Sequence, residues 1–240
     1  MKIEVVASPK LLVREHLEGR TVVVFDVLRA TTTMLSALAA GAIEIRLFGD
    51  VDDCRLAGLA FAGPRILCGE RRALPPPGFD LGNSPGDFTA ERCRGRTLFM
   101  TTTNGTAAVL AAREAAEVLI GAVANRSAVA QRLRITGRDA TLLCAGQRGD
   151  LALEDLIGCG AVLDRLPAES VELANDASAA SLHLYRQFSG DLANVFRTCR
   201  GARTELLQGL SADIDFCAVV DRYVVIGRLD ASSNAIKLAD

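Results

Sequence analysis

The sequence is poor in histidine, in paired cysteines and in net charge. Its two histidines, His16 and His183, lie in amphipathic stretches away from the polar motifs, so we expect neither in catalysis. The seven cysteines are an odd number without a C-x-x-C pair, which argues against a disulfide scaffold and against a zinc site. Reduced thiols suit the cytoplasm, and the cytoplasm is therefore the expected location.

Long apolar runs are also missing. No run approaches the roughly 20 residues that cross a bilayer, and the first ten residues, MKIEVVASPK, lack the apolar core of a signal peptide. A net charge of -2 provides no basic field for nucleic acid or an anionic membrane. Because half of the 240 residues are hydrophobic, we expect a globular protein. We expect it to bind neither nucleic acid nor a membrane, and we predict a homodimer.

A recurring unit of Gly-Arg, apolar strand, polar loop and helix is present instead. It begins near Gly19 (GRTVVVFDVLRATTTML), near Gly95 (GRTLFMTTTNGTAAVL) and, more loosely, near Gly137 (GRDATLLCAGQRGDLALEDL). The first two copies continue alike, with helices expected over 31–40 and 106–116 and strands over 43–48 and 118–123. Such runs favour a parallel or mixed sheet with helices on both faces. We predict one α/β domain over residues 1–240 with an internal repeat.

The remaining segments are assigned more simply. Residues 69–88 hold four of the seven prolines and form a long loop, which at this length is expected to border a functional site. Further expectations are a helix over 151–163 capped by Asp150, a helix over 177–188 capped by Asn175 or Asp176, a helix over 204–210, a last strand over 223–226 and a frayed tail over 231–240.

Two predicted strands end in polar residues that suit an anion. The first strand is followed by Asp26, Arg29, Thr31 and Thr32, and its counterpart by Thr102, Asn104, Gly105 and Thr106. Ligands of open α/β sheets bind beyond the carboxyl ends of strands, and helix N-termini offer free N–H groups to phosphate. Arg29 would add a bidentate contact. The alternative is an ordinary capped turn with a surface ion pair.

Acidic residues lie beside the same strand ends or in the long loop. They are Asp26, Glu70, Asp80, Glu154 and Asp155. If two or three converge, they form an oxygen-ligand site for Mg²⁺, which favours phosphoryl chemistry. The alternatives are Asx-turns at Asp80 and Asn83, and a favourable helix dipole at Glu154 and Asp155.

Four motifs in order, FDVLRATTT, GERRALPPPGFDLGNSP, TTTNGT and CAGQRGDLALEDLIGCG, resemble the 2-phosphosulfolactate phosphatase family. The resemblance covers about residues 24–160. It implies a Mg²⁺-dependent phosphatase that converts (2R)-2-phospho-3-sulfolactate to 3-sulfolactate on a route to coenzyme M. It also implies a three-layer α/β/α fold with a mixed, largely parallel sheet, built from two similar intertwined halves.

The resemblance marks residues in each motif without assigning their roles. They are Asp26, Arg29, Thr31 and Thr32; Glu70, Arg71, Gly78, Phe79, Asp80, Gly82, Asn83 and Ser84; Thr102, Asn104, Gly105 and Thr106; and Glu154 and Asp155.

Our working hypothesis is hydrolysis of a small phosphorylated acid. Asp26, Arg29 and Asp155 are the catalytic candidates, and Asp26, Glu70, Asp80 and Asp155 the magnesium candidates. Phosphate and substrate are assigned to Arg29, Thr31, Thr32, Arg71, Asn83, Ser84, Thr102, Asn104, Gly105 and Thr106, with Arg71 or Arg72 for a second anion.

The chemical route and two rival functions stay open. Water could attack phosphorus directly, or Asp26 could form an aspartyl phosphate. Leu28 stands where a second Asp follows the nucleophile in haloacid dehalogenases, so we favour metal ligation for Asp26. The rivals are a non-catalytic binder of phosphorylated metabolites and an isomerase or lyase with a carboxylate base.

Overall fold

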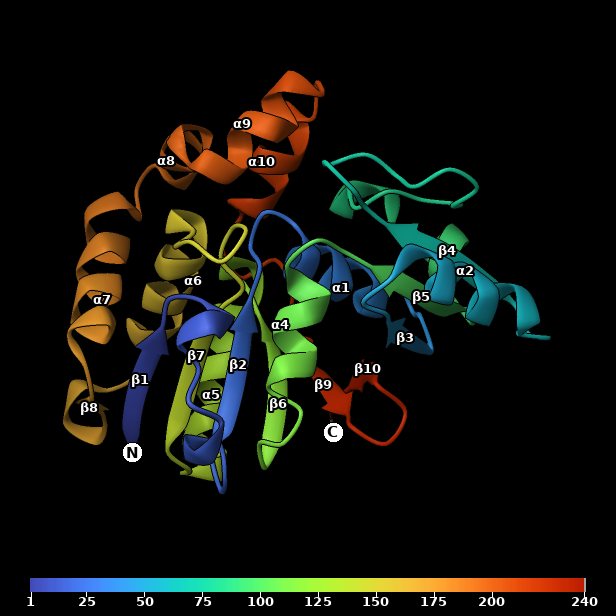
Figure 1. Cartoon of the computed structure of the whole chain (residues 1–240). Coiled ribbons are helices and arrows are strands. Elements are labelled where there is room, and N and C mark those ends of the chain that lie inside the picture. The colour runs from blue at the N-terminus through green and yellow to red at the C-terminus, as the bar shows by residue number, and fades with distance from the viewer. Residues whose placement is uncertain (240) are drawn as a thin grey trace.

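The computed structural model describes residues 1–239 and contains one sheet of ten strands (Figure 1). The strands run in the order β4-β5-β3-β10-β9-β6-β2-β7-β1-β8. Their bounds are β1 Lys2–Val6, β2 Thr21–Phe25, β3 Glu44–Leu47, β4 Arg65–Gly69, β5 Thr97–Thr101, β6 Glu117–Gly121, β7 Ala140–Cys144, β8 Glu172–Leu173, β9 Gly227–Asp230 and β10 Ala235–Leu238.

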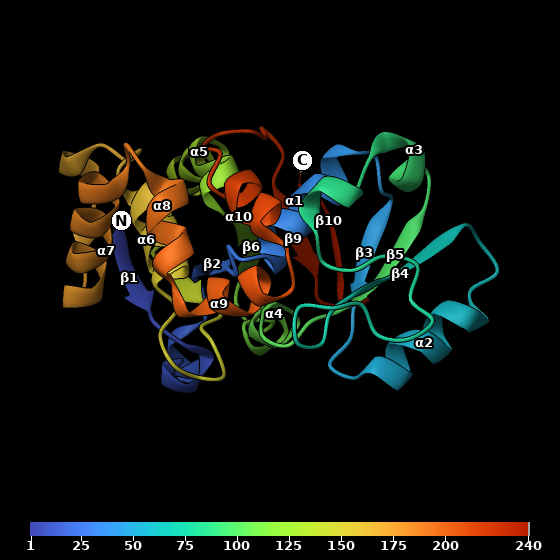
Figure 2. The ribbon, with the colours of Figure 1, turned by 90° about the horizontal axis from the view of Figure 1, so that it is seen from above.

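Helices occupy both faces of the sheet and the region above its strand ends (Figures 1 and 2). Their bounds are α1 Ala30–Ala39, α2 Val51–Ala60, α3 Ala90–Cys93, α4 Gly105–Ala111, α5 Arg126–Thr136, α6 Leu153–Leu163, α7 Asp176–Phe188, α8 Leu192–Thr198, α9 Arg200–Leu207 and α10 Ser211–Cys217. The predicted α/β fold with three layers is confirmed.

Two parallel groups of strands make up most of the sheet. β4, β5 and β3 are parallel to one another, as are β6, β2, β7, β1 and β8. The antiparallel hairpin of β9 and β10 joins the groups, pairing with β6 on one side and β3 on the other. The sheet is therefore mixed and largely parallel, as predicted.

The chain crosses between these groups twice. The run β2-α1-β3 leads from the larger group to the smaller, and β5-α4-β6 leads back. These are the two segments whose sequences resemble each other, and their crossing intertwines the two groups. Figure 1 shows β4 lying across the direction of β2 and pointing toward the middle of the molecule, so that the ends of the two strands approach each other.

Alternating apolar residues in β2 explain why both faces are covered. Val22 and Val24 pack in one core with Met34 and Leu35 of α1. Val23 and Phe25 face the other core, which includes α5 and α6. A strand buried on both faces is typical of a parallel sheet between two helical layers. This places the end of β2, and therefore Asp26, at the centre of the molecule.

The C-terminal predictions were wrong in two places. The expected frayed tail over 231–240 contains β10, which lies in the middle of the sheet with Ala235 and Ile236 fully buried; Asp240 lies outside the described residues. The expected strand over 223–226 is not a strand, and β9 begins after it, at Gly227. Two four-residue strands carry too little periodicity to be separated from a tail, because their burial comes from distant neighbours.

The three helices predicted after residue 150 are present, although their first residues differ from those expected. α7 has Asn175 as its N-cap, with Oδ1 accepting a hydrogen bond from the Ser178 N–H at 3.0 Å. Asp150, however, does not cap α6, which begins at Leu153 after Ala152. The helix expected over 204–210 begins earlier, at Arg200, as α9. Asp150 instead pairs with Gln147 across a tight turn.

The described residues also bear on the expectations for cysteines and membranes. All seven cysteines are buried free thiols. Among residues 1–239, no helix has the length and apolar character needed to cross a membrane.

Candidate active site

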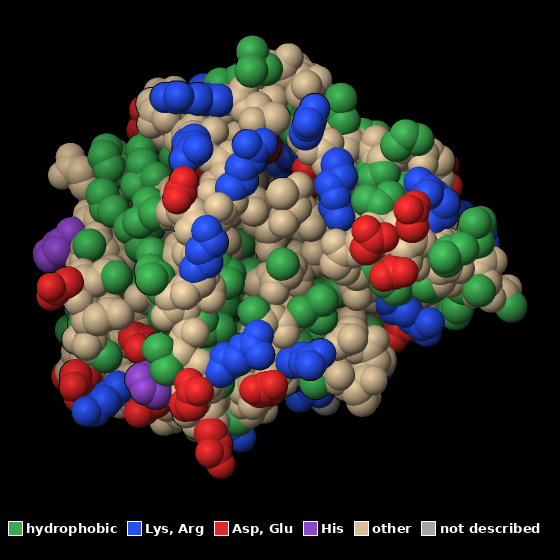
Figure 3. Space-filling view, viewed as in Figure 1, with side chains coloured by type: hydrophobic (Ala, Val, Ile, Leu, Met, Phe, Trp, Pro, Cys, Tyr) green, Lys and Arg blue, Asp and Glu red, His purple; other side chains and the backbone are tan. Residues whose placement is uncertain are grey.

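A cavity of about 430 Å³ lies where β2, β4, β5 and β7 end, below α9. The residues that line it come from the loops after these strands and from α6 and α9. They are Asp26, Leu28, Arg29, Glu70, Arg71, Arg72, Ala73, Asn83, Thr103, Asn104, Gly146, Gln147, Arg148, Ala152, Glu154, Asp155, Gly201, Thr204, Glu205 and Gln208. Figure 3 shows Lys and Arg side chains gathered around this upper part of the molecule.

Asp26 is the first residue after β2 and is 8% exposed. Its Oδ1 accepts a hydrogen bond from the Ala30 N–H at 3.2 Å, at the start of α1. Burial, opposed by the hydrogen bond from Ala30 and supported by the negative charges of neighbouring glutamates, raises the pKa of Asp26 to about 7. An acid in this environment favours a proton or a cation beside it.

Two acids at the start of α6 face the same cavity. Asp155 accepts hydrogen bonds from the Val27 N–H at 2.8 Å and the Gly146 N–H at 3.0 Å, so it ties the loops after β2 and β7 together. Glu154 is 3% exposed, and its Oε2 has no hydrogen-bond partner. Burial raises the pKa of both carboxyl groups, and the nearby Asp26 charge raises that of Asp155 further.

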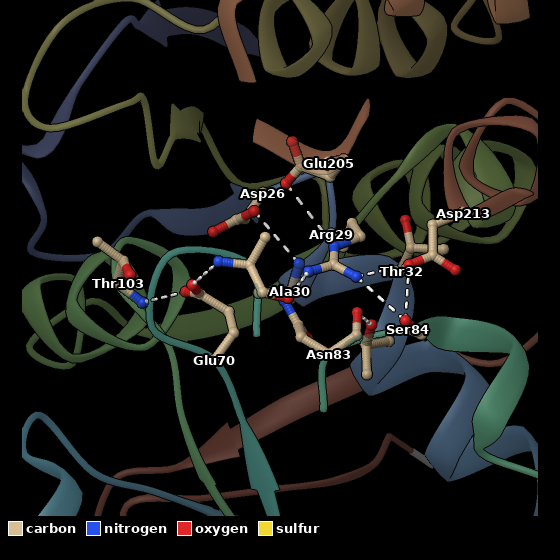
Figure 4. A network of polar contacts seen from close by, with 12 residues as sticks. Asp26, Arg29, Ala30, Thr32, Glu70, Asn83, Ser84, Thr103, Glu205 and Asp213 are labelled. Atoms are coloured by element: carbon tan, nitrogen blue, oxygen red, sulfur yellow. Dashed lines mark hydrogen bonds and ion pairs between the residues drawn. The ribbon is translucent and has the colours of Figure 1, made fainter. Parts of the chain in front are cut away.

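Glu205 of α9 is a fourth buried acid, which the sequence analysis did not identify. Burial raises its pKa to about 7, although the Arg29 guanidinium, with Nε 3.8 Å from Oε1, lowers it. Its Oε2 has no hydrogen-bond partner (Figure 4). Nothing in TELLQGL distinguishes this Glu from a surface helix residue, and only the packing of α9 over the strand ends brings it to the site.

Arg29 is almost fully buried and mainly joins chain segments (Figure 4). Its Nη1 donates to Ser84 Oγ at 3.1 Å and to Asp213 Oδ2 at 2.5 Å, and its Nη2 donates to the Ala73 carbonyl at 2.9 Å. Ser84 also donates to Asp213, at 2.7 Å. The guanidinium thus holds the long loop and α10 against β2, while its Nε lacks a hydrogen-bond partner at the cavity.

The predicted phosphate-binding threonines are not among the residues that line the cavity. The hydroxyls of Thr31 and Thr32 donate to the carbonyls of Asp26 and Val27 at 2.9 and 3.0 Å. Thr106 donates to the Thr102 carbonyl at 3.1 Å, and Thr102 Oγ1 accepts from the Thr106 N–H at 3.1 Å. These hydroxyls satisfy backbone groups at the helix starts, as capping residues do.

The long loop brings some of its predicted residues to the site and leaves others outside. Both carboxylate oxygens of Glu70 accept backbone hydrogen bonds, from Ala73 at 3.1 Å and from Thr103 at 2.7 Å. Asp80 does not converge with the other acids: it is exposed, lies outside the cavity and accepts from the Leu67 N–H at 2.8 Å. Asn83 lines the cavity with an unpartnered Oδ1, whereas Ser84 lies behind Arg29.

Asn104 and Gly105 lie where the loop after β5 leads into α4, and each contributes to the site in a different way. Asn104 lines the cavity, and its Oδ1 accepts from the Arg148 N–H at 3.2 Å. Gly105 does not line it, but a Cβ on this residue would lie 2.7 Å from Asp26 Oδ2 and 2.6 Å from Ala30 Cβ. Arg71 lines the cavity while donating to the Gly49 and Glu70 carbonyls and to Thr101 Oγ1.

Unpartnered polar atoms concentrate at this cavity. Within residues 1–239, six buried side-chain nitrogen or oxygen atoms lack a hydrogen bond, and five belong to lining residues. The five are Arg29 Nε, Asn83 Oδ1, Gln147 Oε1, Glu154 Oε2 and Glu205 Oε2. Because buried polar atoms are normally paired, their concentration indicates a polar ligand.

The donor set also suits a hard cation. In the described part of the chain, no three His, Cys, Asp or Glu side chains are grouped closely enough to hold a metal by themselves. Mg²⁺ does not require such a group, since it keeps several waters and takes one or two carboxylates with substrate phosphate. Asp26, Glu154 and Glu205 offer buried oxygen atoms whose mutual repulsion a cation would reduce.

Comparison with known proteins shows which family the chain resembles. A family model described as 2-phosphosulpholactate phosphatase matches residues 6–232. A relative from Caldanaerobacter subterraneus subsp. tengcongensis is 33% identical over 214 residues, 89% of each chain. One from Synechococcus sp. (strain JA-3-3Ab) is 39% identical over 210 residues, 85% of this chain and 86% of the relative.

A third relative, from Synechocystis sp. (strain ATCC 27184 / PCC 6803 / Kazusa), is 35% identical over 225 residues, 92% of this chain and 93% of the relative. All three relatives are named "Probable 2-phosphosulfolactate phosphatase". The family match extends well beyond the four sequence motifs, into the helices that cover the cavity. The chain therefore belongs to the 2-phosphosulpholactate phosphatase family.

Proposed function

We propose that this protein is a Mg²⁺-dependent phosphatase that hydrolyses the phosphomonoester of (2R)-2-phospho-3-sulfolactate, giving 3-sulfolactate and phosphate. The relatives named above support the reaction. Production of 3-sulfolactate for coenzyme M belongs to the same proposal. The predicted homodimer and cytoplasmic location stay predictions.

The observation that carries the proposal is the distribution of charge in the cavity. Four acids, Asp26, Glu154, Asp155 and Glu205, are buried in it, and two exposed arginines, Arg72 and Arg148, lie among its lining residues. A phosphate dianion placed beside ionised acids is repelled, because like charges interact strongly where water is excluded. A divalent cation between the acids and the phosphate removes this conflict.

When bound, Mg²⁺ would supply charge neutralisation and orientation of the phosphate. Asp26 and Glu154 are the residues we propose to hold it, since Mg²⁺ takes one or two carboxylates beside phosphate. Asp155 positions the site, because its two hydrogen bonds fix the loops after β2 and β7. Arg29 acts likewise by fixing the long loop, and its Nε, which makes no hydrogen bond, is available to a phosphate oxygen.

Direct attack by water is the route we favour. Leu28, a cavity-lining residue, stands where an aspartyl-phosphate mechanism of the haloacid dehalogenase kind needs a second Asp. Glu205, whose pKa is raised to about 7 by burial, can accept a proton from water at neutral pH. The ester oxygen leaves with the sulfolactate and the added oxygen leaves with phosphate.

Phosphate release tests the proposal. The substrate is incubated with the protein in Mg²⁺, after EDTA treatment, and after restoring Mg²⁺ to the treated protein. We expect release that EDTA abolishes and Mg²⁺ restores. Equal release with and without metal would reject the metal requirement, and absence of release from a broad panel of phosphomonoesters would reject the phosphatase.

The same assay separates the rival functions. A non-catalytic binder would bind the phosphorylated acid tightly and leave it intact. An isomerase or lyase would consume the substrate without releasing phosphate, which chromatography of the products detects.

A further inference from the structure

Two tight hairpins of matching construction reach the cavity from different parts of the chain. One follows β4 in GERRAL, where Arg71 and Leu74 exchange backbone hydrogen bonds of 2.9 and 3.3 Å. The other follows β7 in GQRGD, where Gln147 and Asp150 exchange bonds of 2.9 and 3.0 Å. Figure 2 shows these two loops on opposite sides of α4.

Each hairpin has two central residues with positive φ, the first of them arginine. The φ values are 54° and 68° at Arg72 and Ala73, and 55° and 86° at Arg148 and Gly149. A two-residue hairpin of the I′ type requires positive φ at both positions and favours Asn, Asp or Gly there. Arginine is costly in this backbone region, so its occurrence at the same position of both hairpins calls for a role of the side chain.

Both hairpins are anchored through their backbone, and their arginine side chains are exposed. Glu70 accepts from the Ala73 N–H at 3.1 Å, and Asn104 accepts from the Arg148 N–H at 3.2 Å. Both side chains are exposed residues of the cavity lining. Within the described chain, no hydrogen bond or ion pair occupies either guanidinium.

We propose that Arg72 and Arg148 determine substrate specificity by binding the two acidic groups on either side of the phosphate ester. The substrate class is then a small phosphomonoester whose phosphorylated carbon lies between two strong acids, such as a carboxylate and a sulfonate. The inference rests on the proposed function and deepens it.

Chemistry supports this division of the cavity. A guanidinium presents a planar fork of donors that matches the oxygen atoms of a carboxylate or a sulfonate. The phosphate takes the deep end beside Asp26, where the buried acids and their cation lie, and the flanking acids take the exposed end. Arg71 is less suited to this task, because its guanidinium already donates to three oxygen atoms.

The variants for the test are Arg72→Asn and Arg148→Asn, singly and together. Asn tolerates positive φ, so the hairpins keep their backbone while the guanidinium is removed. Arg134→Gln is the matched control, because Arg134 is an exposed arginine of α5 that does not line the cavity. Circular dichroism of every variant verifies folding.

Values of kcat and KM are measured with 2-phospho-3-sulfolactate and with p-nitrophenyl phosphate, which has no acid besides its phosphate. Loss of one charge-assisted contact is worth about tenfold in affinity. We therefore expect each single variant to raise KM for phosphosulfolactate about tenfold more than KM for p-nitrophenyl phosphate, and the double variant about a hundredfold more. Equal changes for the two substrates would overturn the proposal.

A binding measurement keeps this inference separate from the proposed function. The phosphate-free product, 3-sulfolactate, is titrated into the wild type and the three variants by calorimetry. We expect binding that weakens about tenfold for each arginine removed and is unchanged in Arg134→Gln. If neither phosphomonoester is hydrolysed, the proposed phosphatase function is rejected. The titration still shows whether the two arginines bind the acidic groups. Equal binding by all variants, or no binding to the wild type, overturns it.

Discussion

The turns after β2 and β5 have the same local construction and different chemistry. In the first, Thr31 on α1 donates to the Asp26 carbonyl, and Asp26 accepts from the helix at Ala30. In the second, Thr106 on α4 donates to the Thr102 carbonyl, and Thr102 accepts from the Thr106 N–H. Each turn thus uses the residue after the strand to cap the following helix.

The difference lies in that capping residue. Asp26 caps with a carboxylate, lines the cavity and has a pKa raised by burial and by three neighbouring acids. Thr102 caps with a neutral hydroxyl and does not line the cavity. The two helix starts therefore share a turn but differ in role. The first places the acid Asp26 in the cavity, and the second packs Gly105 against Asp26.

The largest effect is expected on activity, where the Asp26 cap and the Thr102 cap should differ. Asp26→Asn keeps an acceptor for the Ala30 N–H but removes the negative charge, so we expect kcat/KM for phosphosulfolactate to fall by about a thousandfold or more. Thr102→Ala removes only a cap, so its loss should stay within about tenfold. Steady-state phosphate release measures both, and equal losses would remove the distinction between the turns.

The next effect is on stability and depends on pH. Burial raises the pKa of Asp26 from 3.8 to about 7, so in metal-free protein its ionisation penalises the folded state. The penalty begins above about pH 4 and is complete above about pH 7. In EDTA, Asp26→Asn should therefore be more stable than the wild type by about 2–4 kcal/mol at pH 8, with little difference near pH 4.

Urea unfolding at several pH values measures that difference. Thr102→Ala is the control, because it carries no ionisable group and its effect should not vary with pH. A stability difference for Asp26→Asn that stays constant from pH 4 to 8 would contradict the assigned ionisation.

A smaller effect probes the contact between the turns. Gly105→Ala adds a Cβ that would lie 2.7 Å from Asp26 Oδ2, so the carboxylate must move. We expect kcat/KM to fall by about 10- to 100-fold, since small displacements of reacting groups are costly. Gly190→Ala is the control, because a Cβ there meets no atom within 4 Å. Activity of both variants at the wild-type level would show that this contact does not position Asp26.

The smallest effect tests what the two turns share. Thr31→Val and Thr106→Val remove hydroxyls that donate to the Asp26 and Thr102 carbonyls. Each should lower the free energy of unfolding by about 1–2 kcal/mol, because a backbone group loses its partner. Chemical denaturation measures both losses, and a large loss at only one site would indicate that the two turns are built differently.

The sequence was most informative where the signal is local. The strand ending at Asp26, the acids that begin α6 and the long loop beside the site all follow from short patterns of apolar, capping and breaking residues. The crossing of the two similar segments between the strand groups agrees with the predicted intertwined halves.

Long-range packing explains what the sequence did not reveal. Asp213 reaches Arg29 across 184 positions, and Glu205 enters the site only because α9 covers it. The strand β10 looked like a tail because its burial depends on β3 and β9. The threonine hydroxyls suggested a phosphate cradle, yet nearby backbone carbonyls compete for the same donors and hold them.

Calorimetric titration of Mg²⁺ into the EDTA-treated wild type, Asp26→Asn and Thr102→Ala tests the central claim most directly. We predict one Mg²⁺ bound per chain by the wild type and by Thr102→Ala, and an affinity at least about tenfold weaker in Asp26→Asn. Binding of Mg²⁺ by Asp26→Asn with the wild-type affinity would contradict the assignment of the first turn as the one that holds the metal.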